Sequence, residues 1–516
     1  MNVRSPMAAE IKSRKDRLAR NSIFSLLSWA IPIVPAFIVT PIIVKGLGTE
    51  VYGVLVIILS FTTYFFAIGV GKLTTKFVAE YLAAGETEKI PDIISSAMIL
   101  SLLLGTAGSG IAALFSRTIV TDVLLISPEY AESAVIGLYL ACATILLTMI
   151  SQVFQFVIMG FQRFDRYLLI TNIGNLLWSA GSVLLVLYGY GLIALLVLNA
   201  ATAAVVGIVS YLIFRSLLPQ FRFTWRVNAR SWNAVWRYGA SILGYQLFGS
   251  VLLLFERGWI MRKFGPEALT HYSVPMALAI YIHLLVSSIL LAVFPMFNEL
   301  LQDRNKLTLL YQKSTKLILS IIVFLLVSSI ACGFVFLQLW LSPAFAAASY
   351  WLLVIHVLTF SLLALSTIIW QVAESFDHAR LNALTTFVWM AVSVPLIVVL
   401  SGSYGTYGAA AARLMGVLVF IPLLLFVEAR FLGGVFWKFW GQVAWRVTLA
   451  AALTFALERI VLTNLPAVWG TLVAAVGLGG VLYLSVLMLT GLFSADEKQM
   501  LRNLFGRFGA VYPGAP

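Results

Sequence analysis

Long apolar runs separated by short polar connections occupy the chain from residue 21 to residue 490. A hydrocarbon core about 30 Å thick needs about 20 apolar residues in one helix. The pattern therefore predicts an all-α integral membrane protein with about fourteen transmembrane helices. These are expected near residues 21–44, 51–70, 91–114, 133–159, 168–188, 191–214, 237–260, 273–296, 317–340, 349–371, 382–400, 407–428, 443–462 and 467–490.

Composition supports the same class. Apolar and aromatic residues make up 61% of the 516 residues, charged residues only 11%, and the mean hydropathy is +0.98. Soluble globular domains are not built from such a composition. The sequence therefore excludes a soluble enzyme or binding module.

The distribution of Lys and Arg predicts the orientation, because basic side chains are retained on the cytoplasmic side of short loops. With the N-terminus inside, the cytoplasmic segments hold 27 basic residues and the outer segments six, while Arg413 lies within a span. We expect a multi-pass protein of the cytoplasmic (inner) membrane with both termini in the cytoplasm. The net charge of +13 then reflects topology and anionic lipid headgroups, so nucleic acid is not an expected partner.

The first 20 residues are basic and precede an apolar run that is longer than the core of a signal peptide and has no small-residue cleavage site. We interpret the run as the first span. Residues 7–20 fit either an amphipathic helix on the inner surface or a solvated tail. Cys142 and Cys332 lie in separate spans, and the four histidines have no metal-ligand spacing, so neither a disulfide framework nor a metal or cofactor is expected.

An internal repeat divides the chain. Four landmarks recur in order in the two halves. They are VKGLGTEVYGV with RKFGPEALTHYSV, AEYLAAGETEKI with NELLQDRNKL, GFQRFDRYLLITNI with QVAESFDHARLNAL around a shared Phe-Asp, and YGYGLIA with YGTYGAA. Because six helices separate equivalent positions, the two units are expected to be parallel repeats, with a cargo cavity between them near the midplane.

This organisation predicts six segments with distinct roles. They are a basic cytoplasmic segment (1–20), an N-terminal six-helix bundle (21–214), a basic cytoplasmic connection (215–236), a C-terminal six-helix bundle (237–428), an additional helix pair (429–490) and a cytoplasmic tail (491–516).

The opening RNSIFSLLSWAIPIVPAFIVTPIIVKGLGTEVYGV, the following GVGKLTTKFVAEYLAAG and the closing GLFSADEKQMLRNLFGR carry a family resemblance. The chain resembles the oligosaccharide flippase branch of the multidrug/oligosaccharidyl-lipid/polysaccharide exporter superfamily over nearly its whole length. The resemblance implies a transporter, not an enzyme, that moves undecaprenyl-pyrophosphate-linked glycan from the inner to the outer leaflet by alternating access. It also implies that polysaccharide assembly proteins are partners besides membrane lipids.

Charged residues in or near spans are candidates for the cavity, because such residues are rare in lipid and usually face protein or water. Glu256 and Arg257 lie toward the outer end of the seventh span, and Gln246 is close to the helical face of Glu256. We expect Arg257 to attract the pyrophosphate and Glu256 to restrain or neutralise Arg257 in the empty carrier. The alternative is that the two residues are an interfacial charge pair. Lys72 and Lys76 share a face and fit either phosphate capture or the inside-positive rule.

The other candidates have equally ordinary alternatives. Arg413 fits a cavity residue or a snorkelling one, and His283 and His356 fit proton carriers or buried histidines that bridge helices. Amides suited to sugar hydroxyls or to bonding between helices are Gln152, Gln155, Asn172 and Asn175. Prolines that favour either a gating or a static kink in the first span are Pro32, Pro35 and Pro41.

Two other functions compete with the flippase. A cation-coupled multidrug exporter of the same superfamily would commonly have twelve spans and a carboxylate in the first helix, but residues 21–44 contain no Asp or Glu. The extra helix pair instead resembles lipid-flipping members, in which it lines a groove for the lipid tail. A membrane-embedded glycan polymerase or ligase would have a large outer loop, whereas residues 116–132 form only a short connection.

Overall fold

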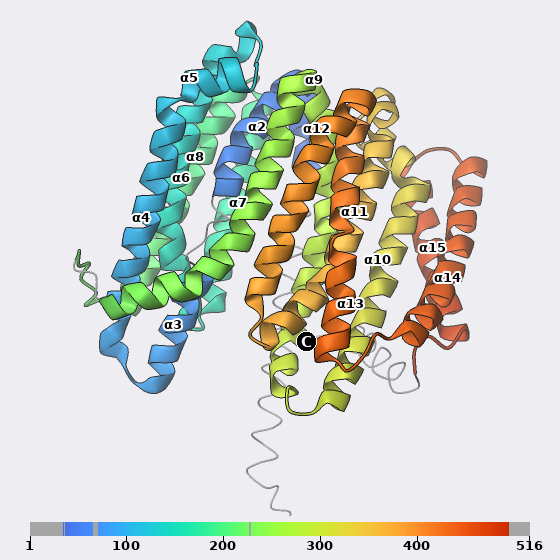
Figure 1. Ribbon diagram of the computed structural model, residues 1–516. Coiled ribbons are helices and arrows are strands. Elements are labelled where there is room, and N and C mark those ends of the chain that lie inside the picture. Colours follow the sequence, from blue (N-terminus) through green and yellow to red (C-terminus); the bar gives the residue numbers. More distant parts are fainter. Residues whose placement is uncertain (1–34, 36, 66–70, 226–228, 495–516) are drawn as a thin grey trace, which may run out of the picture.

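The structure is a computed structural model that describes residues 35, 37–65, 71–225 and 229–494 (Figure 1). Its regular elements within these residues are all helical. The main helices are α2 (Thr49–Phe65), α3 (Gly71–Ala84), α4 (Ile90–Leu114), α6 (Pro128–Gly160), α7 (Phe164–Leu187), α8 (Leu192–Leu217), α9 (Ala229–Glu299), α10 (Arg304–Trp340), α11 (Pro343–Ser375), α12 (Ala379–Val417), α13 (Phe420–Phe431), α14 (Trp437–Asn464) and α15 (Trp469–Leu489). Short helical turns at α5 (Ser116–Thr118) and η2 (Ile119–Val123) lie between α4 and α6.

The expected all-α membrane fold is confirmed. Ten helical stretches of the described residues are long and apolar enough to cross a bilayer, and shorter apolar helices cover Phe37–Leu47 and Thr49–Thr63. Non-helical backbone at Gly265 in α9 and at Gly405 in α12 divides two of the ten stretches, each into two predicted spans. The segments therefore accommodate the fourteen spans. The basic residues 1–20 and Pro32 lie outside the described residues, as do residues 495–516 of the predicted tail.

Several helices extend beyond the predicted spans. The sequence places a span at 317–340, but α10 begins at Arg304, because the carboxylate of Asp303 accepts a hydrogen bond from the Lys306 backbone N–H at 3.1 Å and caps the helix. Residues expected in a connection form α3. Apolar periodicity defines the part of a helix that lies in lipid, and polar turns continue some helices past it.

The backbone repeats at three turns in which one residue has a positive φ. The pairs are Gly48 (82°) with Gly265 (84°), Gln162 (56°) with Asp377 (63°), and Gly189 (78°) with Gly405 (61°). The members of these pairs are 217, 215 and 216 residues apart. The second pair aligns Phe161 with Phe376, each of which follows the end of a helix. This register differs by three residues from the one in which the shared Phe-Asp of the two sequence motifs is aligned. The geometry of these turns supports a duplicated unit.

Contacts arrange the described helices in three groups (Figure 1). Helices α2, α3, α4, α6, α7 and α8 pack among themselves, as do α9 to α13, and the pair α14–α15 lies against α10. The main contact between the first two groups is that of α2 with α9. A residue that connects α2 with α9 therefore acts at the seam between the repeats.

Gly53 permits a close approach of two backbones at this seam. A Cβ atom added to Gly53 of α2 would lie 1.9 Å from the backbone oxygen of Pro266 in α9. We expect Gly53→Ala to destabilise the protein by about 1–3 kcal/mol, because one of the two backbones must move. Gly249→Ala is the matched control, since a Cβ there meets nothing within 4 Å. Equal unfolding temperatures for the two variants in detergent would contradict tight packing at the seam.

Two buried carboxylates fasten the additional helix pair. Glu428 of α13 accepts hydrogen bonds from the Tyr311 hydroxyl (2.8 Å), the Trp440 indole (2.9 Å) and the Phe436 backbone N–H (3.2 Å). Glu458 of α14 accepts one from the Ser328 hydroxyl of α10 at 2.7 Å. Buried carboxylates without such donors are strongly unfavourable. These contacts therefore hold α14 on α10 and α13.

Candidate functional site

A fully buried ion pair lies within the C-terminal group of helices. The Arg413 guanidinium of α12 donates to the Glu256 carboxylate of α9, and the Tyr272 hydroxyl donates to the same carboxylate. The exposed fractions are 1% for Arg413 and 0% for the other two residues. An ion pair out of water needs such additional hydrogen bonds to offset the loss of hydration. The three residues form a compact polar centre, which we call the Glu256 centre.

The turn at Gly265 explains why Tyr272 meets Glu256 on one long element. The positive φ of Gly265 (84°) breaks α9 into two helical segments. Nine residues separate Glu256 from the turn and seven separate Tyr272 from it, which correspond to rises of about 14 and about 11 Å. The two side chains therefore come to similar depths on neighbouring segments.

Aromatic rings enclose the Glu256 centre. The Arg413 guanidinium lies 5.2 Å from the ring centroid of Phe360 and 5.6 Å from that of Trp389. The His356 ring packs edge-to-face on Tyr272 with centroids 4.5 Å apart, and neither of its nitrogens has a hydrogen-bond partner among the described residues. Cation–π contacts stabilise a desolvated guanidinium. The surroundings therefore fix Arg413 on the carboxylate.

Arg257 points to the other repeat. Its guanidinium donates to the hydroxyl of Ser60 in α2 at 2.7 Å, and that hydroxyl donates to the backbone oxygen of Val56 at 2.6 Å. Ser60 has an exposed fraction of 0%, and the Arg257 side chain is half-buried. Adjacent residues of α9 thus hold different parts of the molecule, since Glu256 binds α12 and Arg257 binds α2.

These contacts give the predicted charged residues specific neighbours. The ion-pair partner of Glu256 is Arg413, which the sequence analysis considered separately, whereas Arg257 bonds across the seam. The proposed roles of Arg257 and Glu256 toward a pyrophosphate stay predictions. Sequence reasoning missed Tyr272 and Ser60 as members of the site. Tyr272 stood in the repeat motif RKFGPEALTHYSV, but a serine in an apolar helix gave no signal.

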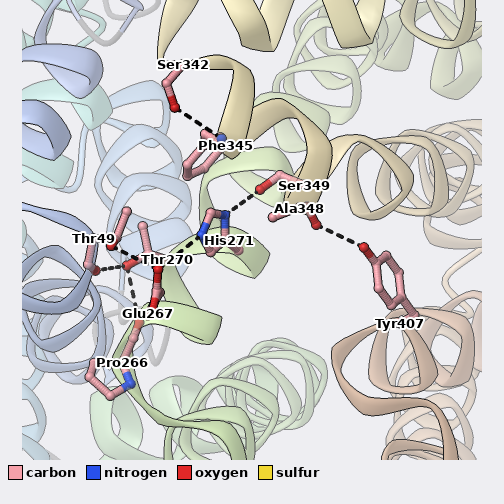
Figure 2. A network of polar contacts seen from close by, with 10 residues as sticks. All are labelled: Thr49, Pro266, Glu267, Thr270, His271, Ser342, Phe345, Ala348, Ser349 and Tyr407. Atoms are coloured by element: carbon pink, nitrogen blue, oxygen red, sulfur yellow. Dashed lines mark hydrogen bonds and ion pairs between the residues drawn. The ribbon is translucent and has the colours of Figure 1, made fainter.

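A second polar network closes the seam at its predicted outer end (Figure 2). The Thr270 hydroxyl of α9 donates to the backbone oxygen of Thr49 in α2, and the Thr49 hydroxyl donates to Glu267 at 3.4 Å. His271 Nδ1 lies 2.8 Å from the Ser349 hydroxyl of α11. Nearby, Arg262 donates to the backbone oxygens of Asp122 and Val123 in the predicted outer connection. Both repeats contribute to this closure.

An apolar cavity of about 410 Å³ lies between the C-terminal helices and the extra pair. Its walls come from α9, α10, α11 and α15, together with Phe37. Aromatic and small residues face it, including Tyr281, Phe324, Phe336 and Gly333. The Ser328 hydroxyl, one of its few polar groups, is engaged by Glu458. The cavity suits a hydrocarbon chain.

Comparison with known proteins identifies the family. Residues 18–301, more than half of the chain, match the family described as "Polysaccharide biosynthesis protein". The chain belongs to this polysaccharide biosynthesis protein family. A membrane protein of Bacillus subtilis (strain 168), EpsK, described as uncharacterized, is 24% identical over 413 residues, which cover 74% of this chain and 78% of that protein.

Solved structures share the fold of this family member. The lipid II flippase MurJ in an inward closed conformation has a TM-score of 0.69 and 12% identity, with 91% of this chain and 97% of that chain covered. An inward-facing multidrug resistance transporter of the MATE family, from the MOP superfamily, has a TM-score of 0.66 and 14% identity, covering 79% and 94%. At such identities the likeness shows the fold, and the protein is a multi-pass membrane protein.

The other predicted cavity residues are spread over several helices of this polysaccharide biosynthesis family member. Lys76 is exposed on α3 with its ammonium 5.6 Å from the Phe77 ring centroid, and Gln155 donates to the Ser151 hydroxyl at 2.9 Å. His283 is half-buried. Half-buried positions are also occupied by Gln246, Gln152, Asn172, Asn175, Pro35 and Pro41. The side chain of Lys72 is outside the described set, so its role stays a prediction.

Proposed function

We propose that this polysaccharide biosynthesis family member translocates an undecaprenyl-pyrophosphate-linked oligosaccharide from the inner to the outer leaflet for cell-surface polysaccharide biosynthesis. The supporting observation is the half-buried Arg257 at the seam between the repeats, beside the Glu256 centre. A pyrophosphate cannot cross hydrocarbon without compensating charge. Guanidinium groups supply charge-assisted hydrogen bonds to phosphate oxygens.

The cavity of about 410 Å³ provides a place for the isoprenoid tail. It opens among helices α9, α10 and α15, so the tail stays in an apolar environment while the charged head is at the seam. Exposing each methylene of the tail to water would cost about 0.8 kcal/mol, so the tail has to stay in lipid or in an apolar site while the head crosses. The resemblance to lipid-flipping members of the superfamily supports the same division.

In the proposed mechanism, alternating access takes place by making and breaking the contacts between α2 and α9 at the seam. Contacts of Thr49 with Glu267 and Thr270 tie the predicted outer ends of α2 and α9 together, which suits a state closed to the outside. In the proposed cycle these contacts break as the repeats rock, and the cargo leaves outward. The protein then resides in the cytoplasmic membrane with both termini inside, beside polysaccharide assembly proteins.

The alternatives differ in their cargo and chemistry. A cation-coupled multidrug exporter would commonly have a carboxylate in the first helix that exchanges protons, but the described first-span residues 37–44 contain no Asp or Glu. A polymerase or ligase would need a reactive outer loop, whereas the turns from Ser116 to Val123 dock on Arg262 through backbone oxygens. Translocation without covalent change to the glycan is therefore the proposed activity.

Reconstitution distinguishes these functions. Proteoliposomes of the full chain should expose a fluorescent undecaprenyl-pyrophosphate-linked glycan to an outer-leaflet reductant faster than empty liposomes do. The same glycan on an uncharged polyprenol is the control for recognition of pyrophosphate. Equal rates with both lipids, transport of a cationic dye instead, or formation of longer glycans would each contradict the proposal.

A further inference from the structure

Ser60 lies on the face of α2 that meets α9. Tyr52, Val56 and Ser60 follow one another at intervals of four residues and therefore share one side of the helix. Ser60 accepts the Arg257 hydrogen bond at 2.7 Å. Because Ser60 is fully buried, its hydroxyl is a specific acceptor at the seam and not a casual surface contact.

The hydrogen bonds of Ser60 polarise its oxygen. The hydroxyl proton is directed to the Val56 backbone oxygen at 2.6 Å, which leaves the oxygen lone pairs toward the arginine. A phosphate oxygen offers a guanidinium the same kind of contact with a full negative charge, which makes a stronger bond. An anion that takes the Nη1 donor of Arg257 would therefore displace Ser60.

Because Glu256 is held within the C-terminal group, displacement of Ser60 from Arg257 loosens a contact between α2 and α9. Glu256 is fixed by Arg413 and Tyr272 within the C-terminal group, so the neighbouring backbone of α9 cannot simply follow α2 when the two separate. The Nη1 donor of Arg257 can bind either Ser60 of α2 or an anion in its place. The choice between them links occupancy of the site to a contact between the repeats.

We propose that Ser60 is an internal competitor of the cargo pyrophosphate for Arg257 and acts as a latch between the repeats that cargo binding releases. The inference rests on the proposed function, because it takes the pyrophosphate as the anion. Ser60 acts through Arg257 and is a positioning residue. In the empty carrier the Arg257–Ser60 bond keeps α2 on α9, and in the loaded carrier it is absent.

Binding of farnesyl pyrophosphate, a short isoprenyl pyrophosphate, to the detergent-purified full chain tests the competition. Ser60→Ala removes the competing acceptor, so we expect the Kd to fall about tenfold. Thr63→Ala is the matched control, because Thr63 also donates to a backbone oxygen of α2 (Leu59, 2.9 Å) but is exposed and has no described contact with Arg257. If Ser60→Ala does not accumulate, Ser60→Cys keeps the size with a weaker acceptor and should change the Kd in the same direction.

The Arg257→Ala variant distinguishes the proposed anion site from the proposed latch. If it binds farnesyl pyrophosphate like the wild type, the proposed anion site itself is wrong. If it loses binding while Ser60→Ala and Thr63→Ala share the wild-type Kd, only the latch is wrong. Weaker binding by Ser60→Ala would make Ser60 a cargo ligand and would also overturn the latch.

Crosslinking tests the coupling to movement. Cysteines at Thr49 and Glu267, whose side chains lie 3.4 Å apart across the seam, should form a disulfide in the empty protein after Cys142→Ala and Cys332→Ser. Farnesyl pyrophosphate should slow this disulfide severalfold, and Ser60→Ala should slow it without ligand. A rate that responds to neither would show that the Arg257–Ser60 bond does not hold the repeats together.

Discussion

Replacing Arg413 with alanine should destabilise the folded protein by about 3–5 kcal/mol, because Glu256 would keep its buried charge without a cation. The Tyr272 hydroxyl alone does not replace a guanidinium that is 1% exposed and held between two aromatic rings. Thermal unfolding in detergent, read from tryptophan fluorescence, measures the effect. Arg117→Ala is the control, since Arg117 pairs with Glu132 on the surface, where both side chains are mostly exposed and ion pairs contribute little.

A double variant separates loss of the pair from loss of packing. Glu256→Leu with Arg413→Met replaces both charges by apolar groups, which is often neutral or stabilising for a buried pair. We expect it to unfold at a higher temperature than Arg413→Ala. If the double variant is no more stable than the single one, the buried charge is not the origin of the destabilisation. Poor transport by a stable double variant would give the Glu256 centre a role beyond folding.

Transport should fall at least about tenfold in Arg257→Ala, which removes the guanidinium proposed to bind the pyrophosphate. Arg257→Lys should retain part of the activity, because the charge remains while the planar arrangement of donors is lost. Flipping is compared in proteoliposomes that contain equal amounts of folded protein. Lys263→Ala is the matched control, because it removes an exposed charge six residues farther along α9.

The alternative interpretation of Arg257 gives a different result. An arginine that merely marks a helix end would tolerate both substitutions, and the flipping rates would stay near those of the wild type and of Lys263→Ala. Wild-type rates in Arg257→Ala would therefore exclude it as the anion site. A loss in Arg257→Lys as large as in Arg257→Ala would show that the bidentate geometry, beyond the charge, is required.

The fold was predictable because lipid imposes a strict length on apolar helices. The recurring turn motifs also predicted the internal repeat. In the structure Gly48 and Gly265 have nearly the same positive φ, at 82° and 84°. Helical stretches outside the apolar core, such as the first turns of α10, were beyond this signal because polar sequences also form helices. Their extent depends on caps such as Asp303, which hydropathy does not detect.

The charged members of the site were predictable, but their pairing and their neutral partners Tyr272 and Ser60 were not. Intramembrane charge identified Glu256, Arg257 and Arg413, yet 157 positions separate the two partners of the ion pair. Only the packing of α12 on α9 brings them together. Glu458 lies within the predicted span 443–462 but was not predicted as a functional residue, and its binding to Ser328 makes it a structural residue of the helix pair. A sequence distinguishes a buried charged residue from a surface one more readily than it distinguishes a buried residue that stabilises the fold from one that acts in the site.

The duplicated backbone has a consequence for stoichiometry. Positions 217 residues before Glu256 and Arg257 hold Val39 and Thr40, and the position 216 residues before Arg413 holds Val197. The first repeat thus copies the turns of the second without its charges. One chain would therefore carry a single pyrophosphate per cycle, and titration of the monomer with farnesyl pyrophosphate should saturate at one equivalent, not two.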